Sequence, residues 1–138
     1  MLDAVLARAR VLLVEDECLL ADDLARAFRR AGAEVVGPAS TLAQGLALVA
    51  SLRRLDVAVL DVNLGGEAVY PLADELARRA VPFLFATGYD APAIDPRHAG
   101  VPRVEKPHTL ADVLRAARDL VAAARGSPGA VVRRPSRP

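Results

Sequence analysis

The chain has 138 residues, 53% of them hydrophobic, and a formal net charge of +1. That length fits one domain with its own hydrophobic core, and the near-neutral charge does not predict a polyanionic partner such as nucleic acid. A single cysteine, Cys18, excludes an internal disulfide and fits a reducing compartment, and no apolar run is long enough for a membrane span. We expect a cytoplasmic protein without a signal peptide.

Short apolar runs alternate with longer amphipathic stretches along the chain. The runs occupy residues 11–14, 34–36, 57–60, 81–86 and 101–104. Continuous apolar runs of this length are typical of parallel strands that are covered on both faces. Residues 1–9, ahead of the first run, are expected to form a short helix.

The first two amphipathic stretches carry helix-end signals. Leu24 and Phe28 recur at helical spacing, and Gly32 ends that helix. Thr41 and Gln44 resemble a capping box that opens the second helix.

A third helix is predicted from about residue 67 to residue 80, which requires Pro71 to lie in its first turn. The last helix has the clearest apolar stripe and is opened by Thr109 and Asp112. Residues 88–100 contain two prolines and two glycines and have no amphipathic stripe. We therefore expect a loop or disordered turns there in place of a full helix.

The alternation predicts an α/β fold, with a doubly wound, five-stranded parallel sheet and a short or disordered fourth helix. We divide the chain into an N-terminal extension (1–8), one domain (9–125) and a disordered basic tail (126–138). The tail contains Arg133, Arg134 and Arg137 and no acid, which leaves residues 1–125 with a formal charge of −2.

Polar side chains follow the predicted strands at their carboxyl ends. Glu15 and Asp16 follow the first strand, Asp61 the third and Thr87 the fourth. Lys106, which is the single lysine beside 17 arginines, follows the fifth. Ligands of open parallel sheets bind outside the carboxyl ends of the strands, so we expect these side chains to form one site.

Three neighbouring carboxylates would repel one another unless a cation lies between them. An all-oxygen donor set favours Mg²⁺ over zinc. A carboxylate in such a site can act as a nucleophile toward a phosphoryl group, with the ammonium and hydroxyl groups stabilising the phosphoryl oxygens.

The residues at these strand ends also match a known family. The matching segments are Val-Leu-Leu-Val-Glu-Asp-Glu (11–17), Leu-Asp-Val-Asn-Leu (60–64), Ala-Thr-Gly (86–88) and Glu-Lys-Pro (105–107). In these segments the chain resembles the receiver domain of two-component response regulators, whose CheY-like fold is flavodoxin-like. The resemblance covers about residues 9–125.

The resemblance implies a role for each acidic residue. Asp61 would accept a phosphoryl group from a phosphohistidine. Glu15, Asp16, Asp61 and the backbone carbonyl of Asn63 would hold Mg²⁺.

The remaining matched residues would act on the phosphoryl group or modulate the site. Thr87 and Lys106 would contact the phosphoryl group, and the bond between Lys106 and Pro107 would be cis, as is typical of the family. Gly88, Tyr89 and Pro107 would modulate the site.

A narrower resemblance lies in residues 82–89, Pro-Phe-Leu-Phe-Ala-Thr-Gly-Tyr, which look like the signature of the FAT GUY subgroup of receivers. The subgroup implies a histidine kinase of the HWE or HisKA2 type as partner. Many receivers have an aromatic residue three positions before the lysine, and this chain has Arg103 there.

We therefore interpret the chain as a single-domain response regulator that signals by protein–protein contact. The kinase is expected to dock near Leu19, Leu20 and Ala21, and phosphorylation to reorder residues 88–100. A histidine phosphotransferase or another regulator is a further candidate partner. The shuttle, phosphate-sink and kinase-feedback roles stay open, and no enzymatic activity is expected beyond intrinsic autophosphatase activity.

Three alternatives compete with this interpretation. A phosphorylation-independent protein-binding scaffold on the same fold is the main one. A haloacid dehalogenase type phosphohydrolase would need an acid where Asn63 stands, and DNA binding has only the Arg133–Arg134 pair in its favour. Cys18 is interpreted as a small buried residue, and His98 and His108 are assigned no chemistry.

Overall fold

The computed structural model describes residues 2–87, 94–105 and 109–126. Its elements are, in chain order, β1 (Arg10–Val14), α1 (Cys18–Arg30), β2 (Glu34–Ala39), α2 (Leu42–Ser51), β3 (Val57–Asp61), β4 (Asn63–Leu64), β5 (Glu67–Ala68), α3 (Tyr70–Arg78), β6 (Phe83–Thr87), the 3₁₀ turn η1 (Pro96–His98), β7 (Arg103–Glu105) and α4 (Leu110–Arg125).

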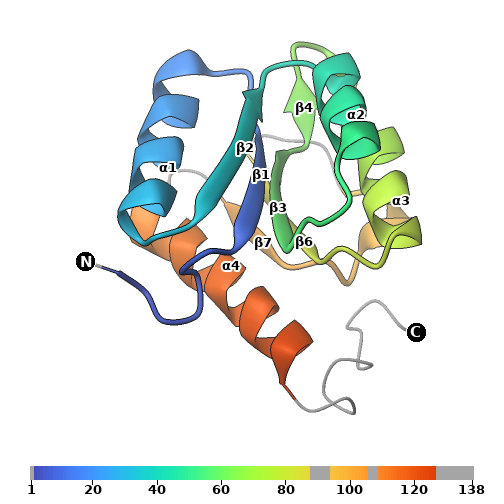
Figure 1. Ribbon diagram of the computed structural model, residues 1–138. Helices are drawn as coiled ribbons and strands as arrows, with labels where there is room; N and C mark the ends of the chain where they lie inside the picture. Colours follow the sequence, from blue (N-terminus) through green and yellow to red (C-terminus); the bar gives the residue numbers. More distant parts are fainter. Residues whose placement is uncertain (1, 88–93, 106–108, 127–138) are drawn as a thin grey trace.

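Five strands form one parallel sheet in the order β2-β1-β3-β6-β7 (Figure 1). The chain first steps outward from β1 to β2 and then returns past β1 to β3, so the strand order reverses between β1 and β3. This is the doubly wound arrangement in which ligands bind beside the reversal point. The predicted fold class is confirmed.

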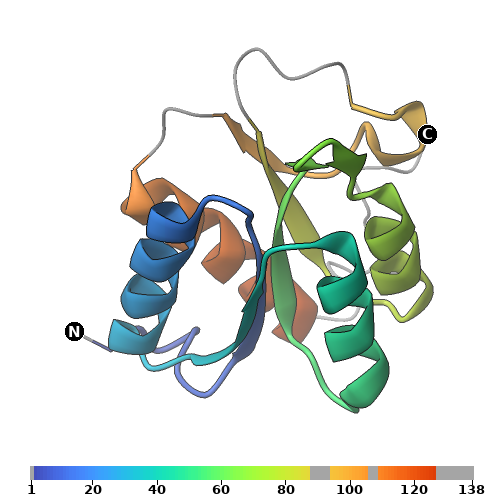
Figure 2. The ribbon, with the colours of Figure 1, turned by 90° about the horizontal axis from the view of Figure 1, so that it is seen from above.

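Helices cover both faces of the sheet, with α1 and α4 on one face and α2 and α3 on the other (Figure 2). Along β1 the side chains alternate between the two faces. Val11 and Leu13 belong to the core under α1 and α4, whereas Leu12 and Val14 belong to the core under α2 and α3. A strand buried on both faces must be apolar throughout, which explains the unbroken run in the sequence.

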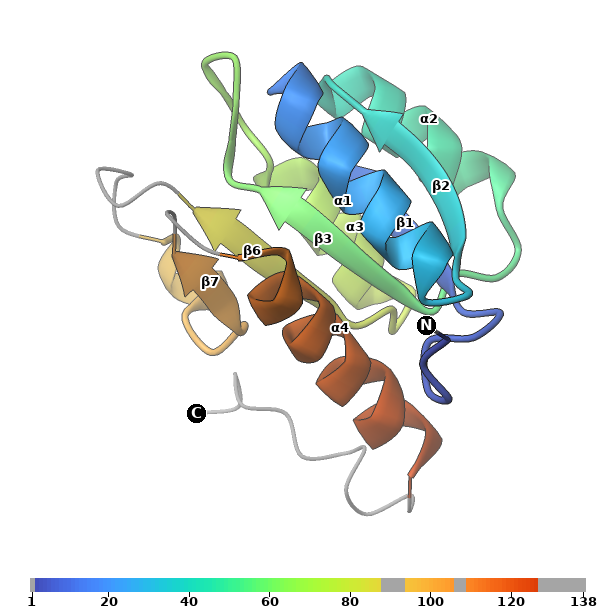
Figure 3. The ribbon, with the colours of Figure 1, turned by 90° about the vertical axis from the view of Figure 1, so that its left-hand side faces the viewer.

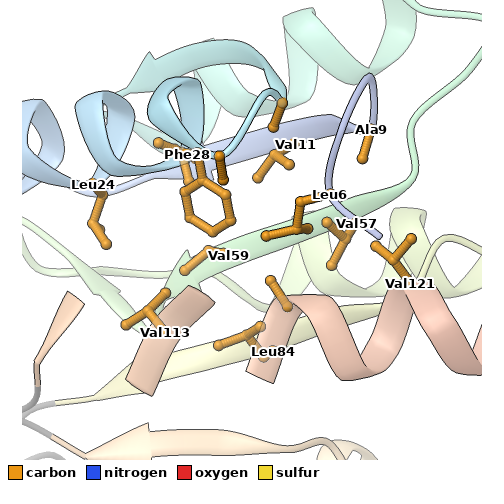
Figure 4. Close-up of a cluster of buried hydrophobic side chains, with 14 of the residues drawn as sticks. Leu6, Ala9, Val11, Leu24, Phe28, Val57, Val59, Leu84, Val113 and Val121 are labelled. Atoms are coloured by element: carbon orange, nitrogen blue, oxygen red, sulfur yellow. The ribbon is translucent and has the colours of Figure 1, made fainter. Parts of the chain in front are cut away.

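The core under α1 and α4 includes a residue from the segment that precedes the sheet. Leu6 is fully buried and lies with Phe28, Val57 and Val121 in the same cluster (Figure 4). Both helices run across this face of the sheet (Figure 3). Residues 4–8 form turns, so the predicted N-terminal helix is wrong. The turn ends because Arg8 has a φ of 66° and its N–H donates to the carbonyl of Gly32.

The predicted third helix begins later than expected, at Tyr70, because residues 63–68 form a β-hairpin. Gly65 and Gly66 lie at the turn with φ of 59° and 98°. Two-residue hairpin turns of this kind need positive φ at both central positions, and a Gly-Gly pair supplies it. Pro71 lies in the first turn of α3, as predicted.

Both predicted helix caps are present. Thr41 Oγ1 accepts from Gln44 N (3.1 Å), although the Gln44 side chain accepts from Ser40 N (2.8 Å) and not from Thr41. Thr109 and Asp112 form the complete capping box. The Thr109 N–H donates to the Asp112 carboxylate and holds its pKa below the usual value. The stabilisation by this cap is therefore lost as pH falls through that lowered pKa.

Two further expectations concern residues near the site. Cys18 is exposed, so its prediction as a buried residue is wrong, because it opens α1 before Ala21, the first residue of that helix in the core. Within residues 94–100, the helical residues are those of η1, which agrees with the predicted short fourth helix. In the described part of the chain, no helix has both the length and the apolar composition that membrane spanning requires.

Gly37 allows β2 to continue past an irregularity in its pairing with β1. Its φ is 93°, and a Cβ at this position would lie 2.7 Å from Ala39 N and 3.1 Å from Leu13 O. Both neighbours are backbone atoms that cannot move aside without disturbing the sheet. Gly66 has a similar φ of 98°, but a Cβ there would have no neighbour within 4 Å.

We predict that Gly37→Ala lowers the free energy of unfolding by about 3 kcal/mol, because it adds a backbone clash to the cost of a positive φ. Gly66→Ala should lose only about 1 kcal/mol, since it carries the conformational cost alone. Urea unfolding monitored by circular dichroism measures both. Equal losses in the two variants would contradict the clash.

Candidate functional site

The candidate site lies at the carboxyl edge of the sheet, where β1 and β3 end side by side. Val14 pairs with Leu60, so the residues that follow them leave the sheet next to each other. Glu15 and Asp16 follow β1, and Asp61 is the last residue of β3. This is the edge at which ligands bind in doubly wound folds.

Three carboxylates meet at this edge. Glu15, Asp16 and Asp61 each offer one carboxylate oxygen within 4.8 Å of the others. Glu15 and Asp61 are buried, with 3% and 7% of their surface exposed, and Asp16 is exposed. The predicted grouping of the acids is present in the structure.

Local backbone hydrogen bonds orient the two buried acids. Glu17 N donates to Glu15 Oε2 (3.0 Å), and Asn63 N donates to Asp61 Oδ1 (3.2 Å). Because carboxylates are fixed by donors two residues further along the chain, the turns after β1 and β3 set their direction.

The β4–β5 hairpin lies beside the exposed acid. The Asn63 side chain accepts from Gly66 N (3.0 Å) and so closes the turn. A Cβ on Gly65 would lie 3.8 Å from Asp16 Oδ2, so a side chain at this position would contact the carboxylate. Sequence reasoning named Asn63 but missed the two glycines, although a Gly-Gly pair just after a strand is a hairpin signal.

The fourth and fifth strands bring further predicted residues to the same edge. β6 ends at Thr87, whose backbone pairs with that of Glu105 at the end of β7. In sequence, Lys106 comes directly after Glu105. Lys106, Pro107, His108, Gly88 and Tyr89 lie outside the described residues, so the predicted cis bond and the roles of these residues stay predictions.

The donor set fits a small hard cation. All three side chains offer oxygen, and Mg²⁺ takes oxygen ligands, usually one or two carboxylates with several waters. Zinc would instead favour histidine or cysteine, and neither is in the cluster. Glu15, Asp16 and Asp61 are therefore the residues that would hold Mg²⁺.

His98, to which sequence analysis assigns no chemistry, has a structural role in the described segment 94–105. It is buried, its Nε2 lies 2.8 Å from Asp74 Oδ1, and its ring stacks on Tyr70 at a centroid distance of 5.8 Å. Asp95 N donates to the Tyr70 hydroxyl (3.0 Å). The η1 segment is therefore attached to α3 by an aromatic and ionic cluster.

Arg97 strengthens the same attachment. Its guanidinium pairs with Asp74 (3.0 Å) and with Asp95 (3.3 Å). The Arg97 backbone N–H donates to the Asp95 carboxylate and is the main reason that the pKa of Asp95 lies below its usual value. A lone histidine and an Asp-Pro-Arg-His run in the sequence do not reveal this packing, because its partners lie on α3.

The start of α1 projects beside the acids. Leu19 is 78% exposed, whereas Ala21 is buried and Leu20 packs against the core. Of the three residues expected to receive a kinase, Leu19 alone presents a large apolar side chain to the surroundings. Cys18, next to it, is exposed as well.

Comparison with known proteins gives the family. No protein-family model matches the chain. SdrG from Sphingomonas melonis Fr1, known from its solution structure, is 38% identical over 86% of this chain and 99% of SdrG, with a TM-score of 0.72. The response regulator receiver protein from Sinorhizobium medicae WSM419 has the same fold, with a TM-score of 0.69 and 24% identity over 84% of this chain and 96% of that one.

The chain belongs to the response regulator receiver family. A curated relative is the transcriptional regulatory protein PdtaR of Mycobacterium tuberculosis, 32% identical over 118 residues. The match takes in 83% of this chain and 57% of PdtaR, so the receiver chain spans little more than half the length of that relative.

We predict that Mg²⁺ shifts the amide resonances around Glu15, Asp16 and Asp61 in an NMR titration. Asp16→Asn should weaken the affinity at least about tenfold, because an amide replaces a charged ligand. Asp23→Asn, which removes an exposed acid further along α1, should leave the affinity unchanged. Equal affinity in the Asp16 variant would remove this residue from the metal site.

Proposed function

We propose that this receiver accepts a phosphoryl group on Asp61 from the phosphohistidine of a histidine kinase. The observation that carries the proposal is the convergence of Asp61 with Glu15 and Asp16 at the carboxyl edge of the sheet. Three neighbouring carboxylates form an all-oxygen donor set of the kind that holds a divalent cation together with a phosphate oxygen. The resemblance of the flanking segments to receivers supports the same role.

In the transfer, an Asp61 carboxylate oxygen attacks phosphorus and forms an acyl phosphate. The bond from phosphorus to the histidine nitrogen breaks, and the imidazole keeps the electron pair and takes up a proton. Mg²⁺, when bound, supplies positive charge to the phosphoryl oxygens. Asn63 N, which donates to Asp61 Oδ1, holds the carboxylate in place.

Thr87 and Lys106 are proposed to bind the phosphoryl oxygens. A hydroxyl and an ammonium are both donors that match the charge developing on those oxygens. The pairing of Thr87 with Glu105 supports this assignment, because it brings the ends of β6 and β7 together. The Asn63 carbonyl is proposed as a further metal ligand. Attack of water on the acyl phosphate would reverse the modification, which is the autophosphatase activity proposed here.

The partners follow from the narrower resemblance. The FAT GUY-like segment 82–89 supports membership of that subgroup and a kinase of the HWE or HisKA2 type. The exposed Leu19 beside the acids supports docking of the kinase at the start of α1. A single cysteine fits a reducing compartment, and we propose that the protein is cytoplasmic.

Output is proposed to pass through protein–protein contact. Phosphorylation would act through Thr87 on residues 88–100. The attachment of η1 to Tyr70 and Asp74 limits this change. Either residues 88–93 rearrange alone, or the contacts of His98 and Arg97 break and expose aromatic surface on α3. The transcriptional regulatory role of PdtaR belongs to that longer protein and is not assigned to this chain.

We predict that Asp61→Asn abolishes phosphorylation by acetyl phosphate, because an amide is not a nucleophile. Intact-mass measurement with and without Mg²⁺ should show one Mg²⁺-dependent phosphoryl adduct on the unaltered protein. Asp119→Asn, which removes an exposed acid on α4, should keep the adduct. An adduct on the Asp61 variant would place the phosphoacceptor elsewhere. No adduct on any folded form, with a partner still captured, would favour the scaffold role.

We predict that Lys106→Arg slows formation of the adduct about tenfold, although the charge is kept, because a planar fork replaces a compact ammonium. Arg103→Lys makes the opposite exchange three residues earlier, on the exposed side of β7, and should leave the rate unchanged. Rates are measured by quenched time courses with acetyl phosphate. Unaltered kinetics for Lys106→Arg would show that the ammonium is not needed.

A further inference from the structure

A second concave site lies at the opposite end of the sheet from the acids. It is a hollow of about 500 Å³ between the ends of α2 and α3 and the loops that lead to β3 and β6. The two helices lie side by side on one face of the sheet (Figure 1). Four arginines line it, Arg53, Arg54, Arg78 and Arg79, with apolar surface from Val49, Leu52, Leu55 and Val81.

The four arginines come from two Arg-Arg pairs that are distant in sequence. Residues 53–54 follow α2, and residues 78–79 end α3. The helices approach closely, since a Cβ on Gly45 would lie 2.8 Å from Leu72 Cδ2. Close packing of α2 on α3 therefore brings both pairs to one rim.

Two of these arginines already have roles in the fold. Arg79 Nη1 donates to Val49 O (2.9 Å) and its Nε to Glu75 Oε2 (2.7 Å). Arg54 Nη2 donates to Arg8 O (3.0 Å) and pairs with Asp56 (3.2 Å). Cations at a helix C-terminus also interact well with the helix dipole.

These contacts do not neutralise all of the positive charge that lines the hollow. Glu75 pairs with both Arg78 and Arg79, and Asp56 pairs with Arg54. Four guanidinium groups thus meet two carboxylates. Among the described residues, the exposed Arg53 side chain has no hydrogen-bond or ion-pair partner. Arg53 directly follows Leu52, the C-cap of α2, and within the described residues no side-chain contact accounts for it.

We propose that the hollow binds an organic polyphosphate of the nucleoside triphosphate class. Ligand sites for small molecules have volumes of about 300–1,000 Å³, and this hollow falls in that range. Guanidinium forks bind phosphate through paired hydrogen bonds. The half-buried side chains of Leu52, Leu55 and Val81 offer an apolar contact for a planar base.

This site is separate from the phosphoacceptor. Val57 at the start of β3 follows the hollow, whereas Asp61 at its end belongs to the acidic cluster. The two proposals can therefore fail independently. Asp61→Asn should keep polyphosphate binding, and loss of the arginines should keep phosphorylation by acetyl phosphate.

The test is an NMR titration of the full chain with ATP, without Mg²⁺ so that the acidic site does not contribute. The amides of residues 52–55 and 78–81 should shift with saturable behaviour. Sodium tripolyphosphate should bind more weakly than ATP, and adenosine more weakly still. Arg53→Gln should lower the affinity roughly fivefold, because it removes one guanidinium and leaves the packing intact.

Arg30→Gln is the matched control, since it removes an exposed arginine at the end of α1, on the other face of the sheet. It should bind ATP like the unaltered protein. The proposal is overturned if ATP causes no shift in the hollow, if Arg30→Gln and Arg53→Gln weaken binding equally, or if tripolyphosphate binds as tightly as ATP. The last result would indicate a general anion site without a place for the base.

Discussion

The rest of the structure depends on holding three carboxylates close together at one edge of the sheet. Two unit charges 4.8 Å apart repel by roughly 3 kcal/mol at an effective dielectric constant of 20. The fold holds Glu15, Asp16 and Asp61 together despite this cost, because their backbones continue directly from neighbouring parallel strands. The apolar packing of β1 and β3 on both faces therefore holds the three acids side by side.

Most of the architecture could be predicted because the sequence carries its signals locally. Unbroken apolar runs predict parallel strands, and the caps at Thr41 and Thr109 are present where the sequence places them. The acids of the site could be predicted for the same reason, since strand ends of a parallel sheet share one edge. Topology alone then brings these residues together without any knowledge of side-chain packing.

The sequence-based predictions fail where two local patterns compete, or where the structure depends on contacts with residues that are distant in sequence. Gly65 and Gly66 form a tight hairpin turn that places Glu67 and Ala68, the start of the predicted third helix, in strand β5. Turn chemistry therefore overrides the helical pattern at those two residues. The sequence predicts a helix over residues 1–9, but residues 4–8 form turns, and the bond from Arg8 N to Gly32 O ends them. The burial of His98 depends on Tyr70, Phe83 and Phe85, which approach it only in the folded chain.

The register between β1 and β3 gives the acidic cluster one more property. Side chains alternate along a strand, so a slip of one residue would turn Asp61 toward the opposite face. A compact but loosened state could keep its helices and still lose this alignment. The affinity for the proposed Mg²⁺ would then depend on the register between β1 and β3. When the core begins to melt, this affinity would decline before the helical content does.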